Sequence, residues 1–84
     1  MNLWIYYDDL RKRRICKNKS EFHRVWLQTG NHTYLSTIDA QGREPSATVV
    51  VRLYGNLLHA GLPDLAMRLH GEMISKTSTN EIVQ

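Results

Sequence analysis

The sequence predicts a small α+β domain in which two helices cover one face of an antiparallel sheet, a three-stranded meander with an additional N-terminal strand. Residues 2–8 are dense in aromatic and β-branched residues, which favour a strand. Residues 33–61 contain three β-prone segments separated by turn signals. Residues 20–30 and the segment from residue 62 onward carry apolar residues at helical spacing, which predicts the two helices.

The N-terminal strand is predicted at residues 2–8 and ends at two consecutive aspartates. Residues 10–19 follow as an exposed basic loop or a short edge strand, because only Ile15 and Cys16 offer apolar contacts there. Lysine and arginine on a sheet edge discourage unwanted strand pairing. The basic segment is therefore expected at the surface.

The first helix is predicted to begin at Ser20, whose hydroxyl suits an N-cap. Phe22, Val25 and Trp26 follow at spacings of three and four, which places them on one helical face. Gly30 is positioned to end this helix in the left-handed conformation. The segment is expected to form two to three turns that bury its apolar face.

The three-stranded meander is predicted between residues 33 and 61. Its strands are expected at residues 33–39, 46–54 and 57–61, which are rich in β-branched and aromatic residues. Residues 39–42 have the Asp-first, Gly-last pattern of a type I turn. The Gly-Asn pair at 55–56 suits a two-residue hairpin turn.

The last helix is predicted to open with Pro63 in its first turn. An apolar stripe at helical spacing follows, formed by Leu62, Leu65, Ala66, Leu69 and Met73. The sequence thus predicts one α+β domain over residues 1–76. Residues 77–84 are polar and are expected to form a frayed C-terminal tail.

The length of 84 residues gives a single domain with a small core. The one cysteine, Cys16, excludes an internal disulfide, and no Cys/His spacing indicates zinc. A domain of this size is often stabilised by a partner subunit, so a homodimer is one expectation. The N-terminus is too short and polar for a signal peptide, and no apolar run reaches the roughly 20 residues that span a membrane. These features predict a cytoplasmic protein without a membrane partner.

Positive charge is concentrated near the N-terminus. Residues 11–24 hold seven basic residues against one acid, a net charge of +6, whereas the rest of the chain sums to −3. Such a block is typical of a surface that binds phosphates or an acidic protein. Tyr6 or Tyr7 is a candidate stacking or anchor residue beside it. The candidate contacts are Arg11, Lys12, Arg13, Arg14, Lys17, Lys19 and Arg24. The plainer interpretation is a solvated loop, with both tyrosines in the core.

No catalytic or metal-binding motif stands out in the sequence, and no cofactor is predicted. None of His23, His32, His59 and His70 lies four residues from another histidine. Cys16 has basic neighbours in the sequence, which lower a thiol's pKa, so it is expected to be exposed and to react readily.

Three functions remain open on this basis. The leading hypothesis is a non-enzymatic interaction protein, a regulator or stoichiometric inhibitor that binds a nucleic-acid-handling protein through the basic surface. The alternative is a regulator that binds nucleic acid directly. The third is a small ribonuclease-type toxin, because such sites leave no linear motif.

Overall fold

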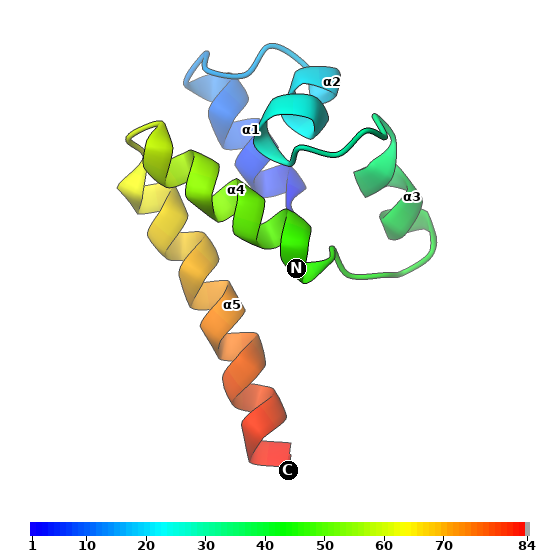
Figure 1. The fold of residues 1–84 in the computed structure, drawn as a ribbon, viewed down its shortest axis with the longest axis vertical. Helices are drawn as coiled ribbons and strands as arrows, with labels where there is room; N and C mark the ends of the chain where they lie inside the picture. The colour runs from blue at the N-terminus through cyan, green and yellow to red at the C-terminus, as the bar shows by residue number, and fades with distance from the viewer. Residues whose placement is uncertain (84) are drawn as a thin grey trace. The chain divides into compact units, whose positions relative to one another are not determined.

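The computed structural model describes the backbone of residues 1–83 and the side chains of residues 1–74. Within this range all regular secondary structure is helical, and no strand is present (Figure 1). The helices are α1 (Trp4–Lys12), α2 (Lys19–Glu21), the π-helix η1 (Phe22–Trp26), α3 (Tyr34–Ala40), α4 (Ala47–His59) and α5 (Pro63–Val83). The chain divides into two compact units, unit 1 (Met1–Leu53) and unit 2 (Tyr54–Gln84).

The predicted α+β architecture is therefore wrong. The segment predicted as the N-terminal strand, residues 2–8, lies largely in α1. The first meander strand, at 33–39, corresponds to α3, and the strand at 46–54 lies mostly in α4. The third strand, at 57–61, corresponds to the end of α4 and the turn after it. The Gly-Asn pair at 55–56 is inside α4 and makes no hairpin turn.

Burial at helical spacing explains why these segments are helices. In and just before α1, the buried residues are Leu3, Tyr6 and Leu10, three and four positions apart. In α3 the buried residues are Leu35 and Ile38. A strand would bury every second residue instead, so the packing of these side chains outweighs their preference for strands.

The same spacing governs α4, despite its run of three valines. Val49, Val50, Leu53 and Leu57 are buried, which is a helical stripe. Gly55 lies exposed in the middle of this helix, where glycine costs about 1 kcal/mol relative to alanine. The buried stripe stabilises α4 in spite of the glycine and the β-branched residues.

The helix predicted near residue 20 exists with different ends. Asn18, not Ser20, is the N-cap, and its side-chain oxygen accepts a hydrogen bond from the Glu21 N–H at 2.9 Å. The residue that adopts the left-handed conformation after η1 is Gln28 (φ +56°), not Gly30. Val25 was expected in the core with Phe22 and Trp26, but it is 48% exposed.

Three helices end in the same motif, with a left-handed residue just after the helix. These residues are Arg14, Gly42 and Gly61, with φ values of +59°, +63° and +76°. At each, the next residue's N–H donates to the carbonyl five positions earlier, at 3.0, 2.8 and 2.9 Å respectively. Glycine adopts this conformation without strain, whereas Arg14 does so at a cost of about 1–2 kcal/mol.

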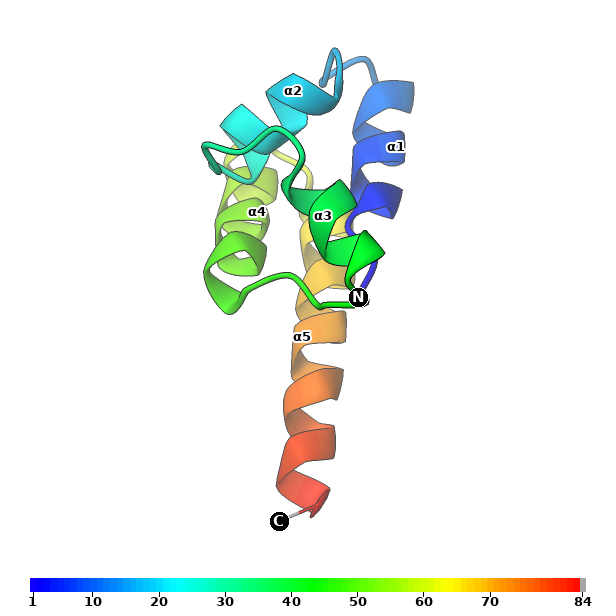
Figure 2. The same ribbon diagram turned by 90° about the vertical axis from the view of Figure 1, so that its right-hand side faces the viewer.

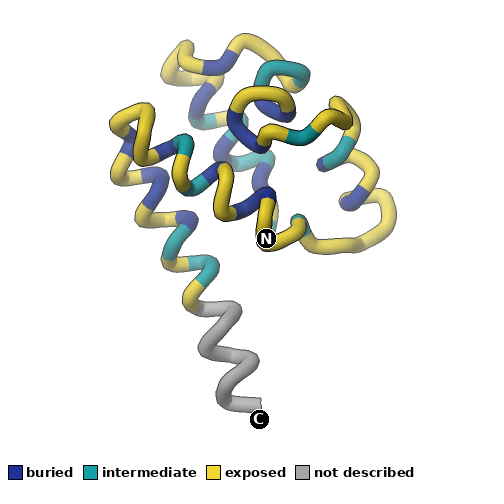
Figure 3. Tube along the Cα trace, in the orientation of Figure 1, coloured by how far each residue is buried: buried dark blue, intermediate teal, exposed yellow. Residues whose placement is uncertain are grey.

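Unit 2 consists of the end of α4, a turn at residues 60–62, and α5. The prediction of a helix that opens with Pro63 is confirmed. The buried residues of this unit are Leu57, Leu62, Leu65, Ala66 and Leu69. Figure 3 shows buried positions recurring along the end of α4 and the first turns of α5. The rings of Tyr54 and His70 are 5.6 Å apart, which joins the end of α4 to α5. α5 extends to Val83. The end of the domain at residue 76, with a frayed tail after it, stays a prediction. Of the helices that the structure describes, none is long and apolar enough to cross a membrane.

Candidate functional site

A polar surface of unit 1 is formed by residues 18–41, here called the two-helix element. It consists of α2 with η1, a connection at residues 27–33, and α3. Asn31 orders the connection, because its side-chain oxygen accepts hydrogen bonds from the Thr33 N–H at 2.9 Å and the Thr33 hydroxyl at 2.8 Å. Arg52 on α4 donates to the Gln28 carbonyl at 3.0 Å, which fixes the start of the same connection.

His23 links the two parts of this element. Its side chain is completely buried, with Nδ1 2.7 Å from the Lys19 carbonyl oxygen and Nε2 3.2 Å from the Leu35 amide nitrogen. A carbonyl only accepts and an amide N–H only donates, so the ring is neutral and carries its proton on Nδ1. The Leu35 N–H belongs to the first turn of α3 and has no partner within that helix. His23 therefore caps α3 from the preceding helix.

Trp4 holds the other end of α3. Its indole N–H donates to Asp39 Oδ2 at 2.7 Å, which joins α1 to the last turn of α3 (Figure 2). The Trp4 ring makes edge-on contacts with Tyr7 and His23, at centroid distances of 5.7 and 5.9 Å. The Lys19 ammonium lies 5.2 Å from the centre of the same ring. Contacts from two different helices thus fix the position of α3.

The outer face of α3 is uncharged and polar. Leu35 and Ile38 are buried, so Thr33, Ser36 and Thr37 are exposed along the opposite face. Ser36 and Thr37 offer hydroxyl donors and acceptors, while the Thr33 hydroxyl donates to Asn31 and offers an acceptor. The two threonines add a methyl group each. These three residues were predicted to lie in a strand at 33–39, so the sequence did not predict this face.

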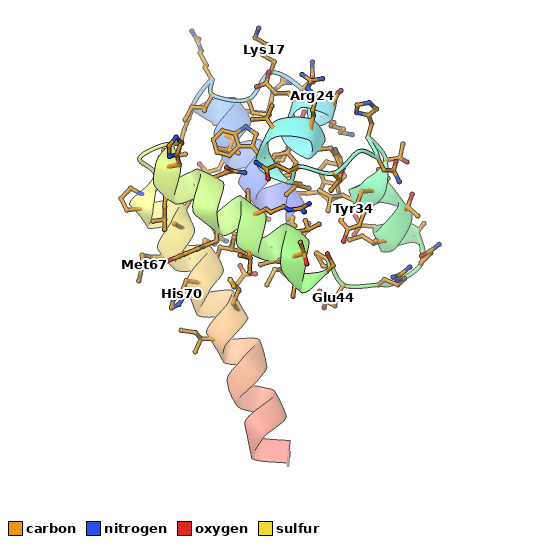
Figure 4. All side chains as sticks on the ribbon, in the orientation of Figure 1. Lys17, Arg24, Tyr34, Glu44, Met67 and His70 are labelled. Carbon is orange, nitrogen blue, oxygen red and sulfur yellow. The ribbon has the colours of Figure 1, made fainter. Side chains whose placement is uncertain are left out.

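The seven candidate basic residues are all exposed in unit 1. Arg11–Arg14 occupy the end of α1 and the turn after it, while the other three lie on or just before α2 and η1. Lys17 and Arg24 extend away from the helices at this end of unit 1 (Figure 4). The Arg11 guanidinium donates to the Lys17 carbonyl, which brings the two parts of the basic segment together. Arg13 pairs with Asp9 at 3.3 Å.

The two candidate tyrosines differ in their surroundings. Tyr6 has no exposed surface and belongs to the core. The Tyr7 ring is half-buried and packs against Phe22, at a centroid distance of 5.4 Å. The Arg11 guanidinium lies 6.0 Å from the centre of the Tyr7 ring. Tyr7 thus packs between α1 and η1 and lies beside Arg11 of the basic segment.

Cys16 corrects another expectation, because it is buried and only 3% exposed. Its Sγ lies 3.3 Å from the Asn18 carbonyl oxygen, to which the thiol donates. Burial raises the pKa of the Cys16 thiol, in spite of the basic residues around it in the sequence. The predicted exposed, reactive thiol is therefore wrong.

The other histidines are scattered. His32 Nδ1 lies 3.1 Å from Ser20 Oγ at the surface of the two-helix element. His59 is exposed at the end of α4, and His70 packs on Tyr54 in unit 2. In the part of the chain with described side chains, no group of three or more His, Cys, Asp or Glu side chains is arranged to hold a metal ion.

These features define a class, a small helical protein whose basic unit presents a short helix with a polar outer face. A family with the description "Family of unknown function (DUF6626)" matches residues 5–79. This match covers most of the chain, so the protein belongs to that family. No curated protein and no solved structure matches the chain.

Proposed function

We propose that the protein binds double-stranded DNA, and that its two-helix element acts as a helix-turn-helix with α3 in the major groove. The observation that carries this proposal is the polar outer face of α3, held in position by His23 at one end and Trp4 at the other. A helix that reads bases needs short polar side chains on its outer face and a fixed attachment to the body behind it.

The outer residues of α3 suit contacts with base edges. Serine and threonine hydroxyls donate to or accept from either kind of base pair, and a threonine methyl packs against the methyl group of thymine. Ser36 and Thr37 supply these groups, and Thr33, whose hydroxyl donates to Asn31, supplies an acceptor and a methyl group. The connection before α3 has seven residues, longer than the usual turn of three or four. The hydrogen bonds of Asn31 and Arg52 compensate for this length by fixing its backbone.

The basic residues suit contacts with phosphates. In a helix-turn-helix the first helix crosses the DNA backbone while the second reads the bases. Lys17, Lys19 and Arg24 lie on or beside α2 and η1, which correspond to that first helix. Unit 1 has a net charge of +4, from nine basic and five acidic residues, which favours association with DNA.

Two further proposals accompany this function. A homodimer would present two α3 helices to half-sites one turn of DNA apart, and paired half-sites would be its signature. A DNA-binding regulator in the cytoplasm agrees with the location predicted from the sequence. The stoichiometric inhibitor and the ribonuclease-type toxin stay predictions, and no described contact favours either.

The first experiment selects bound duplexes from a random-sequence library and then measures affinity by fluorescence anisotropy. The selected duplex should bind more tightly than a scrambled one. Thr37→Ala should reduce this preference by about 5- to 150-fold, equal to about 1–3 kcal/mol for one base contact. The matched control is Thr48→Ala, an exposed threonine at the start of α4, which should leave the preference unchanged.

A second set of variants tests the phosphate contacts. Lys19→Ala and Arg24→Ala should weaken binding to both duplexes equally, and each should reduce the salt slope by about 1. No enriched sequence, together with no duplex binding at about 50 mM salt, would overturn the proposal. Co-purification with one nucleic-acid-handling protein would then favour the inhibitor.

A further inference from the structure

We infer that His23 is a positioning residue, whose neutral Nδ1–H form holds α3 in the orientation that contacts DNA and whose protonation releases it. The DNA part of this inference rests on the proposed function. The docking of α3 by His23 concerns the protein alone and is tested without DNA.

The geometry makes the ring a two-sided connector. On one side its Nδ1–H donates to the Lys19 carbonyl at 2.7 Å, and on the other its Nε2 accepts from the Leu35 N–H at 3.2 Å. The ring is completely buried, so water does not replace either bond. The bond to Leu35 joins residues that are 12 apart in the sequence and belong to different helices, so it exists only when α3 is docked.

Protonation removes the acceptor on which this connection depends. An imidazolium has two N–H donors and no acceptor. Its Nε2–H would face the Leu35 N–H, and neither of these two facing groups would have an acceptor. An unpaired buried donor and a buried charge are both unfavourable. Breaking the contact exposes the ring to water and allows it to carry its charge. Acid should therefore uncouple the first turn of α3 from η1.

The surroundings do not offset this effect. Both ring nitrogens bond to backbone groups, so no carboxylate occupies the position that would stabilise the imidazolium. Glu21 accepts a bond from the Lys17 amide, and Asp39 accepts the indole N–H of Trp4. The titratable and charged residues on the elements around the ring are Tyr6, Tyr7, Asp8, Asp9, Arg11, Lys12, Lys19, Glu21, Arg24, His32, Tyr34 and Asp39.

The pH dependence of DNA binding should distinguish release of α3 from a general increase in positive charge. Lowering the pH from 8 to 5 spans the range in which histidine commonly titrates. Acid makes the protein more positive, which strengthens contacts with phosphates of any sequence. Release of α3 removes the base contacts alone. The affinity for the selected duplex should therefore fall at least 10-fold while that for a scrambled duplex does not fall.

The first test uses the protein without DNA. Nitrogen NMR of labelled histidine should identify the Nδ1–H form of His23 at pH 8. Amide exchange at Leu35 should be slow at pH 8 and should accelerate on acidification, relative to the exchange expected from pH alone. An Nε2–H form at pH 8, or a Leu35 amide whose protection does not change down to pH 5, would overturn the inference.

The second test uses His23→Gln, whose side-chain oxygen can accept the Leu35 N–H and does not titrate. This variant should bind the selected duplex with a pH profile that is flat between 8 and 5. The His23→Gln variant and the protein that keeps His23 are compared in a background that carries His32→Gln, which removes the exposed histidine at the same surface. A loss of affinity in acid that His23→Gln does not flatten would contradict the inference. If no duplex binds at any pH, the proposed function fails, and the NMR test still decides the role of His23.

Discussion

Unit 1 and unit 2 are stabilised in different ways. Unit 1 has short helices whose positions depend on side-chain hydrogen bonds between elements, such as those of His23 and Trp4. Unit 2 is a turn between two helices with a leucine-rich buried face. Unit 1 carries a net charge of +4 and unit 2 a net charge of −1. Directional bonds of this kind hold the polar surface of unit 1 in a defined shape.

The largest effect is expected in unit 2, from Leu69→Ala. Leu69 is completely buried, and loss of its side chain should lower the free energy of unfolding by about 2–5 kcal/mol. The control is Met67→Ala, two residues away and 61% exposed, which should change stability by less than about 0.5 kcal/mol. Urea denaturation followed by circular dichroism measures both. Equal effects of the two substitutions would show that the leucine face does not stabilise unit 2.

In unit 1, Trp4→Phe should break the hydrogen bond to Asp39 and should remove less buried apolar surface than Leu69→Ala. The substitution removes the donor to Asp39, and a hydrogen bond to a charged group contributes about 1.5–3 kcal/mol at most. We expect a loss of about 1–2 kcal/mol, because Asp39 is exposed and water takes the place of the indole. Affinity for the selected duplex should fall as well. Asp39→Asn, which keeps an acceptor for the indole, should cost less, and a larger cost than that of Trp4→Phe would contradict this account.

One arginine and one lysine substitution to glycine should change the stability of the protein in opposite directions while removing the same charge. Arg14→Gly relieves the left-handed strain after α1 and should stabilise the protein by about 1 kcal/mol. Lys12→Gly, in the last turn of α1, should destabilise it by about 1 kcal/mol. Each variant loses one positive charge, so both should weaken DNA binding similarly in about 50 mM salt. Thermal unfolding and anisotropy together check this prediction, and a destabilised Arg14→Gly would refute the strain.

The smallest effect is expected at Cys16. At neutral pH a maleimide should label this thiol far more slowly in the folded protein than in urea, because the side chain is buried. The raised pKa of Cys16 favours the neutral thiol in the folded state. Its contribution to stability is therefore present at neutral pH and is lost as the pH rises through the folded-state pKa. Fast labelling under native conditions at neutral pH would disagree with the burial.

The sequence predicted the last helix correctly because Pro63 and a stripe of leucines agree on its start and its buried face. It failed at residues 46–54, where valines favour a strand locally but Val49, Val50 and Leu53 are buried at helical spacing. Strand preference is a weak guide when packing decides the outcome.

The candidate site was only partly predictable. Charge alone identified the basic segment, and all seven of its candidate residues are exposed. The outer face of α3 was missed because its residues were assigned to a strand. The partner of His23 is the backbone N–H of Leu35, which comes close only after α3 has docked, so no local pattern predicts it.

The single buried cysteine also provides a way to measure ligand binding. Labelling requires a transient opening around Cys16, because the thiol is shielded in the closed state. A ligand that binds only the closed form reduces the open population by a factor of 1 + [L]/Kd. When opening and closing are fast relative to labelling, the labelling rate falls by the same factor. A titration with unlabelled duplex would then yield the dissociation constant from thiol modification alone, without attaching a dye to either molecule.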